Sequence, residues 1–158
     1  MKKYIVPVLI LLAFAVFIFP NLPLIDEPDI GNELPEQTSQ TMIEKDGSYT
    51  SKDEVAAYIN EYGELPSNFI TKSEASELGW KSNEGNLWEV AEGMSIGGDR
   101  FGNREGLLPA ENGRDYYECD INYEGGYRGA ERIVFSGDGL IFYTADHYET
   151  FEQLYGEE

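Results

Sequence analysis

The sequence predicts an α+β domain in which three short helices come first and an antiparallel β-sheet follows. Capping signals and helical apolar spacing are confined to residues 51–93, whereas period-two alternation and turn residues dominate residues 95–153. Helices and strands do not alternate along the chain, as they would around a parallel sheet. These two observations favour the α+β class over an α/β class.

Each expected helix begins at a capping signal and ends at a glycine. Capping boxes of the form Ser/Thr-x-x-Glu open the helices over residues 51–63 and 71–79, where a serine or threonine and a glutamate can each accept a backbone N–H. An asparagine opens the third helix, over residues 86–93. Glycine closes a helix well because it adopts the left-handed conformation at low cost.

The strands are recognised by alternation between glycine-rich turns. They are expected at residues 95–101, 116–123, 132–136, 140–144 and 150–153. The glycines of the turn at 137–139 join the third of these strands to the fourth as a hairpin.

The stretch 116–123 carries the most informative pattern. Glu118 and Asp120 share one face with two other polar or aromatic residues, while Cys119 and Ile121 lie on the apolar face with two tyrosines. We expect the apolar face on the core and the carboxylates on an open face of the sheet. Two neighbouring carboxylates need cations opposite them, and Arg128 supplies one of them in the next segment.

Arg132, at the start of the following strand, supplies a second cation, and the only histidine, His147, follows the fourth strand. A carboxylate, arginines and one histidine on neighbouring strands outline a site for acid–base chemistry on a phosphate. Cys119 is the sole cysteine, so no intrachain disulfide forms, and we expect it to be a small core residue.

Charge and composition divide the 158 residues into three parts. Residues 1–19 are basic and then apolar, which fits a signal peptide or an uncleaved N-terminal membrane anchor. Residues 20–49 are rich in Pro, Glu, Asp and Asn and predict an acidic disordered linker. Residues 50–158 form the folded domain. The bulk of the protein is therefore expected outside the cell, secreted or tethered at its surface.

The net charge is −19, from 11 basic and 30 acidic residues. This balance argues against general affinity for nucleic acid. All five arginines nevertheless lie within residues 100–132, and arginine is the bidentate phosphate binder. The same window holds seven carboxylates, so the arginines either bind phosphate or balance local acids.

Several motifs resemble the barnase-like family of secreted bacterial guanyl-preferring ribonucleases. The resemblance is collinear from about residue 53 to residue 151. It is carried by LPSNFITKSEA at 65–75, LGW at 78–80, SIGGD at 95–99, FGNREG at 101–106, DINY at 120–123 and TADHY at 144–148. It implies the α+β fold of microbial ribonucleases and an endoribonuclease that cleaves single-stranded RNA without a cofactor or a metal.

The resemblance also implies roles for individual residues. Glu118 is implied as the general base and His147 as the general acid of transphosphorylation to a 2′,3′-cyclic phosphate, which is then hydrolysed. Lys72, Arg128 and Arg132 are implied to hold the scissile phosphate. Asp120 is expected to orient the two arginines. RNA carries its own nucleophile, so these parts suffice.

The loop at 101–105 resembles the base-reading loop of that family. Glu105 can accept from guanine N–H groups and backbone N–H groups near Asn103 and Arg104 can donate to O6, while Phe101 packs beside the base. A plain polar turn is the simpler explanation of the same residues. Gly102 stands where relatives carry serine, which loosens the loop.

Tyr148 resembles the residue that lines the site beside the acid, and Arg114 is a candidate for a structural ion pair. An inactive acidic surface binding module on the same fold is the alternative function. Divalent-cation binding is a third idea, although no run such as D-x-D-x-D-G occurs. The expected partners are RNA and a barstar-like cytoplasmic inhibitor, and the expected state is a monomer.

Overall fold

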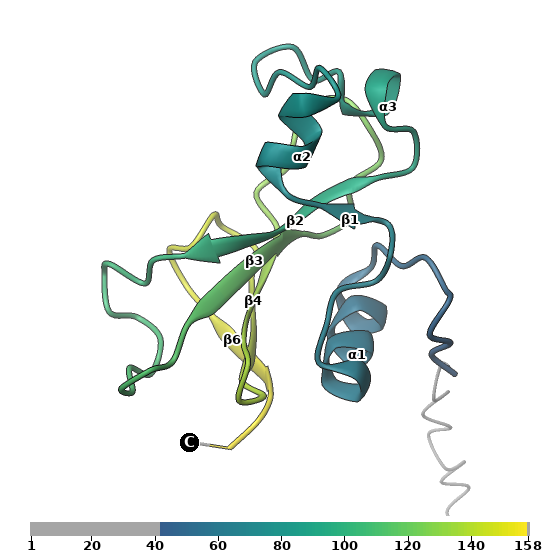
Figure 1. The fold of residues 1–158 in the computed structure, drawn as a ribbon. Coiled ribbons are helices and arrows are strands. Elements are labelled where there is room, and N and C mark those ends of the chain that lie inside the picture. The colour runs from purple at the N-terminus through teal and green to yellow at the C-terminus, as the bar shows by residue number, and fades with distance from the viewer. Residues whose placement is uncertain (1–41, 158) are drawn as a thin grey trace, which may run out of the picture. The chain divides into compact units, whose positions relative to one another are not determined.

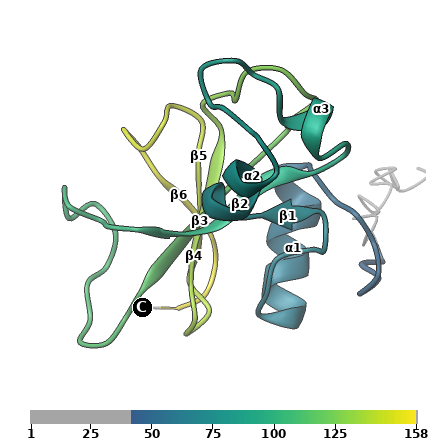
Figure 2. The same ribbon diagram turned by 45° about the horizontal axis from the view of Figure 1, so that its top comes forward.

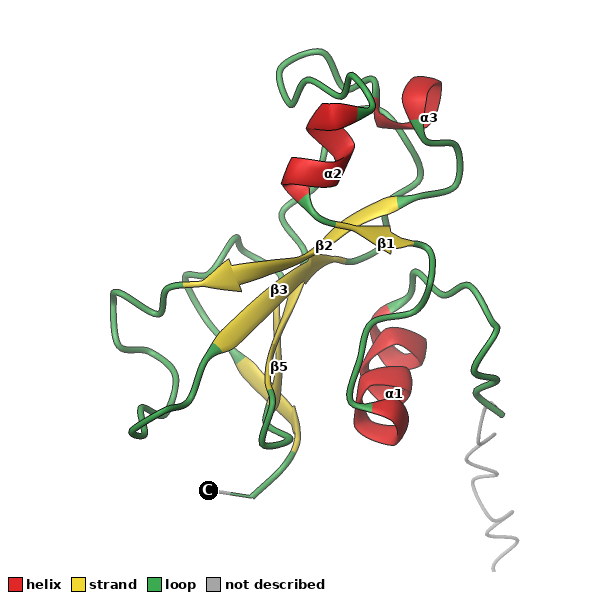
Figure 3. Cartoon of the chain, viewed as in Figure 1, coloured by secondary structure: helices red, strands yellow, loops and turns green. Residues whose placement is uncertain are grey.

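The computed structural model describes residues 42–157. The leader at 1–19 and most of the linker at 20–49 lie outside the described residues. Helices and strands follow one another as in Figure 1, and Figure 3 distinguishes them by type. In chain order they are α1 (Lys52–Tyr62), β1 (Phe69–Ile70), α2 (Lys72–Glu77), α3 (Leu87–Val90), β2 (Ser95–Phe101), β3 (Tyr116–Asp120), β4 (Arg132–Ser136), β5 (Ile141–Thr144) and β6 (Glu152–Tyr155).

The six strands form one sheet in the order β1-β2-β3-β4-β5-β6. Strands β2 to β6 pair antiparallel as consecutive neighbours, which is the expected meander. The α+β class predicted from the sequence is confirmed. The last strand was expected at 150–153 and begins two residues later, because the loop after β5 is held by its own hydrogen bonds through Thr150.

Strand β1 departs from the prediction. It lies between α1 and α2 and pairs parallel with β2, so that Phe69 opposes Ser95 and Ile70 opposes Ile96. The order of helices first and an all-antiparallel sheet afterwards is therefore wrong at this point. A two-residue strand is too short to show alternation, and its partner lies 26 residues further along the chain.

The first two helices start where their capping boxes predict, whereas Asn86 makes no side-chain capping hydrogen bond at α3, which ends at Val90 before the expected Gly93. Ser51 accepts the backbone N–H of Glu54 at the start of α1, and Thr71 and Glu74 form a complete capping box at α2. Figures 1 and 2 show α2 and α3 near the β1 end of the sheet, with α1 apart from them. Helix α1 ends at Gly63, which is left-handed with φ of 70°.

The main core lies between α1 and one face of the sheet. Val55, Ala56 and Ile59 of α1 pack with a set of buried apolar residues from three strands and the bend after β3. These partners are Cys119, Ile121, Ile133, Phe135 and Ile141. Burying a side chain such as Ile133 contributes about 1.5–3 kcal/mol. The alternation of β3 therefore turns Glu118 and Asp120 toward the opposite face.

The opposite face of the sheet is covered rather than open. Glu118 is 7% exposed and Asp120 is 2% exposed. The prediction of an open carboxylate face is therefore wrong, because Lys72 of α2 and Tyr148 of the loop after β5 lie over Glu118. Tyr117, expected in the core, is 36% exposed.

Strand β3 is shorter than predicted. It ends at Asp120, and Asn122 has a φ of 55°, outside the β region. Asn122 is one of the residue types that tolerate this conformation. The chain leaves the sheet here and returns at Arg132, which forms a loop over residues 121–131 between β3 and β4.

Residues 43–49, which the sequence assigns to the linker, contact α1. The Tyr58 hydroxyl donates to the Lys45 carbonyl at 2.9 Å, and the Tyr62 hydroxyl donates to the Ile43 carbonyl at 3.1 Å. The Tyr49 backbone is paired with the side-chain amide of Asn68. Between residues 42 and 157, none of the helices has the length and hydropathy that a membrane span requires.

Candidate active site

Glu118 is the buried carboxylate at the centre of the candidate site. Its Oε1 is ion-paired with the Lys72 ammonium, and its Oε2 accepts a hydrogen bond from the Tyr148 hydroxyl. Burial alone would raise the pKa of Glu118, but the hydrogen bonds from Lys72 and Tyr148 outweigh burial and hold the pKa below its ordinary value. The carboxylate is therefore ionised near neutral pH and ready to accept a proton.

Lys72 reaches Glu118 from the first turn of α2. The capping box on Thr71 sets where this helix begins. Asp99 of β2 accepts the Lys72 backbone N–H at 2.9 Å, and the same oxygen lies 4.0 Å from the Lys72 Nζ. Asp99 thus anchors both the backbone and the ammonium of Lys72. This role of Asp99 was not predicted, because no local spacing in the sequence connects position 99 with position 72.

Asp120 holds two arginines on the same face of the sheet. The Arg128 guanidinium donates to both Asp120 oxygens, with N–O distances of 2.6 Å each. Arg132 lies on the other side, with Nε 2.9 Å from Asp120 Oδ1. The angle at this second contact is too poor for a hydrogen bond, so it is an ion pair only. Burial would lower the pKa of Arg128, but Asp120 raises it above its ordinary value.

The loop before β4 holds the other end of the Arg132 guanidinium. Its Nη1 donates to the Gly129 carbonyl at 2.8 Å and to the Glu131 carbonyl at 2.7 Å. The Arg132 side chain is 3% exposed. One carboxylate and two carbonyls, together with the neighbouring Tyr148, therefore set the direction of this buried cation.

His147 and Tyr148 lie in the loop after β5, and both have left-handed backbones with φ of 59° and 75°. Two consecutive non-glycine residues in this region are costly and need support from their surroundings. Asp146 supplies the support: its carboxylate accepts from the backbone N–H of Glu149 and from the backbone and hydroxyl of Thr150. The hydrogen bond from the Thr150 hydroxyl contributes most to lowering the pKa of Asp146 to about 2.

His147 is exposed, and its ring lies 4.7 Å from the Tyr148 ring, measured between centroids. Tyr148 therefore touches both the histidine, through its ring, and Glu118, through its hydroxyl. Burial and the Glu118 bond raise the pKa of Tyr148, so that it stays a hydrogen-bond donor at neutral pH. The structure brings the carboxylate and the histidine to the two sides of one tyrosine.

The loop that follows β2 is closed by Asn103. Its side-chain amide donates to the Leu108 carbonyl at 2.9 Å and accepts the Leu108 backbone N–H at 3.1 Å. Phe101 packs against Tyr148, with ring centroids 5.1 Å apart, which ties the loop to the site. Arg104 and Glu105 are exposed. A hollow of about 350 Å³ is lined by residues 100–105.

Gly102 leaves no large gap in this loop. A Cβ built at this position would meet Arg104 Cγ at 3.6 Å and Arg104 Nε at 3.7 Å, which are ordinary contact distances. Its φ is not left-handed. The loop could therefore carry a serine at this position. The effect of glycine is to make the loop backbone more flexible.

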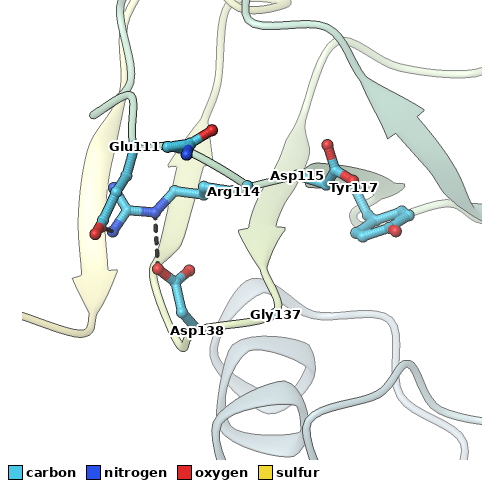
Figure 4. A pocket seen from close by; sticks show the side chains of 8 residues that line it. Glu111, Arg114, Asp115, Tyr117, Gly137 and Asp138 are labelled. Atoms are coloured by element: carbon cyan, nitrogen blue, oxygen red, sulfur yellow. Dashed lines mark hydrogen bonds and ion pairs between the residues drawn. The ribbon is translucent and has the colours of Figure 1, made fainter.

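A larger hollow, of about 430 Å³, lies elsewhere and includes none of the predicted catalytic or base-reading residues (Figure 4). Arg114 crosses it, with Nε donating to Asp138 at 2.8 Å and Nη2 paired with Glu111 at 2.7 Å. Arg114 is thus the structural ion-pair residue that the sequence suggests. Over residues 42–157, no group of three or more His, Cys, Asp or Glu side chains is arranged to hold a metal ion.

The domain holds a buried ionised carboxylate, two carboxylate-held arginines and a lysine on one side of its sheet, with a histidine in the loop after β5. These groups suit proton transfer and phosphate binding. Comparison with known proteins identifies the class further. A family model described as ribonuclease matches residues 52–155. The chain therefore belongs to the ribonuclease family, and it is an endoribonuclease.

Individual relatives agree with this family. A ribonuclease of Heyndrickxia coagulans is 57% identical over 102 residues, which cover 65% of this chain and 94% of the relative. A ribonuclease of Bacillus intermedius is also 57% identical over 102 residues, and the match covers 63% of that relative. The guanyl-specific ribonuclease St of Saccharopolyspora erythraea is 46% identical over 55 residues, which cover 34% of this chain and 54% of the relative.

Proposed function

We propose that this endoribonuclease cleaves single-stranded RNA on the 3′ side of guanosine by transphosphorylation and then hydrolysis. The observation that carries the proposal is the ionised, buried Glu118, which shares its sheet face with Asp120 and the two arginines and is joined to His147 through Tyr148. A base, an acid and cationic groups are the parts that phosphodiester cleavage requires, because RNA supplies its own 2′-OH nucleophile.

In the first step Glu118 takes the proton of the ribose 2′-OH. The 2′-oxygen forms a bond to phosphorus while the bond from phosphorus to the 5′-oxygen breaks, and His147 gives its proton to that leaving oxygen. In the second step His147 takes a proton from water and the water oxygen forms a bond to phosphorus. The bond from phosphorus to the 2′-oxygen breaks, and Glu118 returns its proton to that leaving oxygen. Both residues end in their starting protonation states.

Lys72 has two uses in this scheme. In the free protein it pairs with Glu118 and keeps the carboxylate ionised. Its side chain is 41% exposed, so it can turn toward an arriving phosphate. Moving the ammonium away from Glu118 removes the charge that lowers the pKa of this carboxylate, and the carboxylate becomes a stronger base when substrate is present. Arg128 and Arg132 stabilise the charge of the pentacoordinate state.

Guanine preference is assigned to the loop that follows Phe101. We assign to Glu105 the role of accepting from the base N–H groups, and to backbone N–H groups near Asn103 and Arg104 the role of donating to O6. The closure of the loop by Asn103 and its contact with Tyr148 through Phe101 support this role. The name of the Saccharopolyspora relative also points to guanine.

The setting of the enzyme is proposed from charge and from the leader. We place the enzyme outside the cell, secreted or tethered by its N-terminal segment, acting as a monomer. A cytoplasmic inhibitor that inserts carboxylates among the site cations would protect the producing cell. The acidic surface would slow association with such an acidic partner. An inactive acidic binding module is the competing function, favoured only by the net charge of −19.

The purified full-length chain should cleave GpN dinucleotides to the 2′,3′-cyclic phosphate faster than it cleaves ApN dinucleotides, with chelator present throughout. Chromatography of the products over time measures both steps. Folded protein that cleaves neither substrate across a range of salt concentrations would instead support the binding module. Equal rates on GpN and ApN would remove the guanine preference and leave the ribonuclease.

A further inference from the structure

Glu131, the last residue of the loop over residues 121–131, makes contacts on both faces of the sheet. Its backbone carbonyl accepts from Arg132 Nη1 at 2.7 Å on the catalytic side. The same carbonyl accepts the backbone N–H of Ile121 at 3.2 Å, across the ends of the loop at 121–131. The position of this one carbonyl therefore affects both the loop and the direction of the Arg132 guanidinium.

The side chain of Glu131 is held on the face that α1 covers. Its carboxylate accepts a hydrogen bond from the Tyr143 hydroxyl, and both of its oxygens lie 3.2 Å from Asn122 Nδ2. Tyr143 is the register partner of Ile133, whose side chain is in the α1 core. The Lys52 ammonium of α1 lies 5.0 Å from the Tyr143 ring centroid.

The partners of the carboxylate are themselves fixed. The backbone N–H of Asn122 donates to the Thr50 carbonyl at 2.8 Å, next to the start of α1. Tyr143 belongs to β5. Its hydrogen bond to Glu131 contributes most to raising its pKa to about 12, so the tyrosine hydroxyl remains a donor at neutral pH. The same bond lowers the pKa of Glu131, which stays a charged acceptor.

We propose that Glu131 is a positioning residue for the proposed phosphate-binding Arg132: its carboxylate, held by Tyr143 and Asn122 on the α1 face, fixes the carbonyl that orients the guanidinium on the catalytic face. The inference rests on the role proposed for Arg132. Two of the acceptors around that guanidinium are loop carbonyls, beside Asp120 and Tyr148, so the loop contributes directly to its direction.

The effect should be a loss of turnover. A displacement of a catalytic group by about 1 Å costs on the order of 100-fold in rate, and partial loosening of one of the acceptors of Arg132 should cost about tenfold. Glu131→Ala removes the acceptor. Glu131→Gln retains an amide oxygen that can accept from both Tyr143 and Asn122, so it should restore the rate to within about twofold of the natural chain.

The test measures kcat and KM on a GpN dinucleotide, with thermal unfolding recorded for every variant. Glu64→Ala is the matched control, because Glu64 is an exposed acid that pairs with Lys45, away from Tyr143 and Asn122. At temperatures where every variant is folded, we expect Glu131→Ala to lower kcat about tenfold. Tyr143→Phe should lower kcat less, and the control should leave kcat unchanged.

A double-mutant cycle with Arg132→Lys shows whether Glu131 acts through the arginine. If it does, adding Glu131→Ala to Arg132→Lys changes kcat by less than about twofold. An equal loss in both backgrounds, or unchanged kcat in Glu131→Ala, overturns the inference and leaves the role of Arg132 intact. Full activity of Arg132→Lys overturns the proposed role of Arg132 and, with it, the inference.

Discussion

Removal of the Lys72 ammonium should move the acid limb of the pH–rate profile. In the natural chain a buried Glu118 is kept ionised against the effect of burial by Lys72 and Tyr148. Lys72→Ala removes the charged partner and leaves burial, which raises the pKa of Glu118. The acid limb of kcat/KM, which reports the essential base of the free enzyme, should therefore shift to higher pH.

The magnitude follows from the contacts. A hydrogen bond to a charged partner contributes about 1.5–3 kcal/mol. Lys72 is 41% exposed, so solvent screening favours the lower end, and we expect kcat/KM at a fixed pH on the acid limb to fall about tenfold. Activity at neutral pH should also fall, because the phosphate loses a cation.

The same contact makes stability depend on pH. The pKa of Glu118 is lowered in the folded state, so its contribution is present above the ordinary value of 4.5 and is lost as the pH falls through the folded-state value. As the pH is lowered through this range, the melting temperature of Lys72→Ala should therefore fall less than that of the natural chain.

The assay is kcat/KM on a GpN dinucleotide across pH, at constant ionic strength. Lys81→Ala is the matched control, since Lys81 is an exposed lysine paired only with the nearby Glu84. An acid limb at the same pH in the natural chain and in Lys72→Ala would refute the account of how Glu118 is kept ionised. A limb that moves to lower pH would refute it as well.

Three further predictions follow from charge and from loop contacts. Activity should rise with salt from the lowest ionic strength and then fall, because salt first screens repulsion between RNA and the acidic surface; a monotonic fall would contradict this. Asn103→Ala should lower the ratio of GpN to ApN cleavage by loosening the loop at Leu108, with kcat on ApN as the control. Arg114→Ala should lower the melting temperature by breaking the pairs with Glu111 and Asp138, with kcat unchanged; a loss of kcat in folded protein would argue against a purely structural role.

Local signals in the sequence were sufficient for some elements. The capping box at Thr71 and Glu74 predicts the start of α2, because both partners are three residues apart and the interaction depends on little else. The strands β2 and β4 were expected at the residues where they occur, since alternation is a local pattern. The parallel strand β1 has no such pattern, and its pairing with β2 is a tertiary contact.

The candidate site shows the same division. The opposite charges of Asp120 and the two arginines predicted that they interact, and the structure shows both ion pairs. The burial of Glu118 was missed, because the groups over it come from positions 72 and 148. Asp99 and Glu131 were missed for the same reason: each acts on a cation through contacts that only the folded chain creates.

The pH–rate profiles of Glu118→Ala and His147→Ala test whether these two residues are the base and the acid. We expect a bell-shaped kcat/KM profile on GpN for the natural chain, whose acid limb disappears in Glu118→Ala and whose alkaline limb disappears in His147→Ala. Each variant should lose between about 10² and 10⁴ in rate, as expected for a general base or acid. A Glu118→Ala variant that keeps both the rate and the acid limb would contradict the assignment of Glu118 as the base.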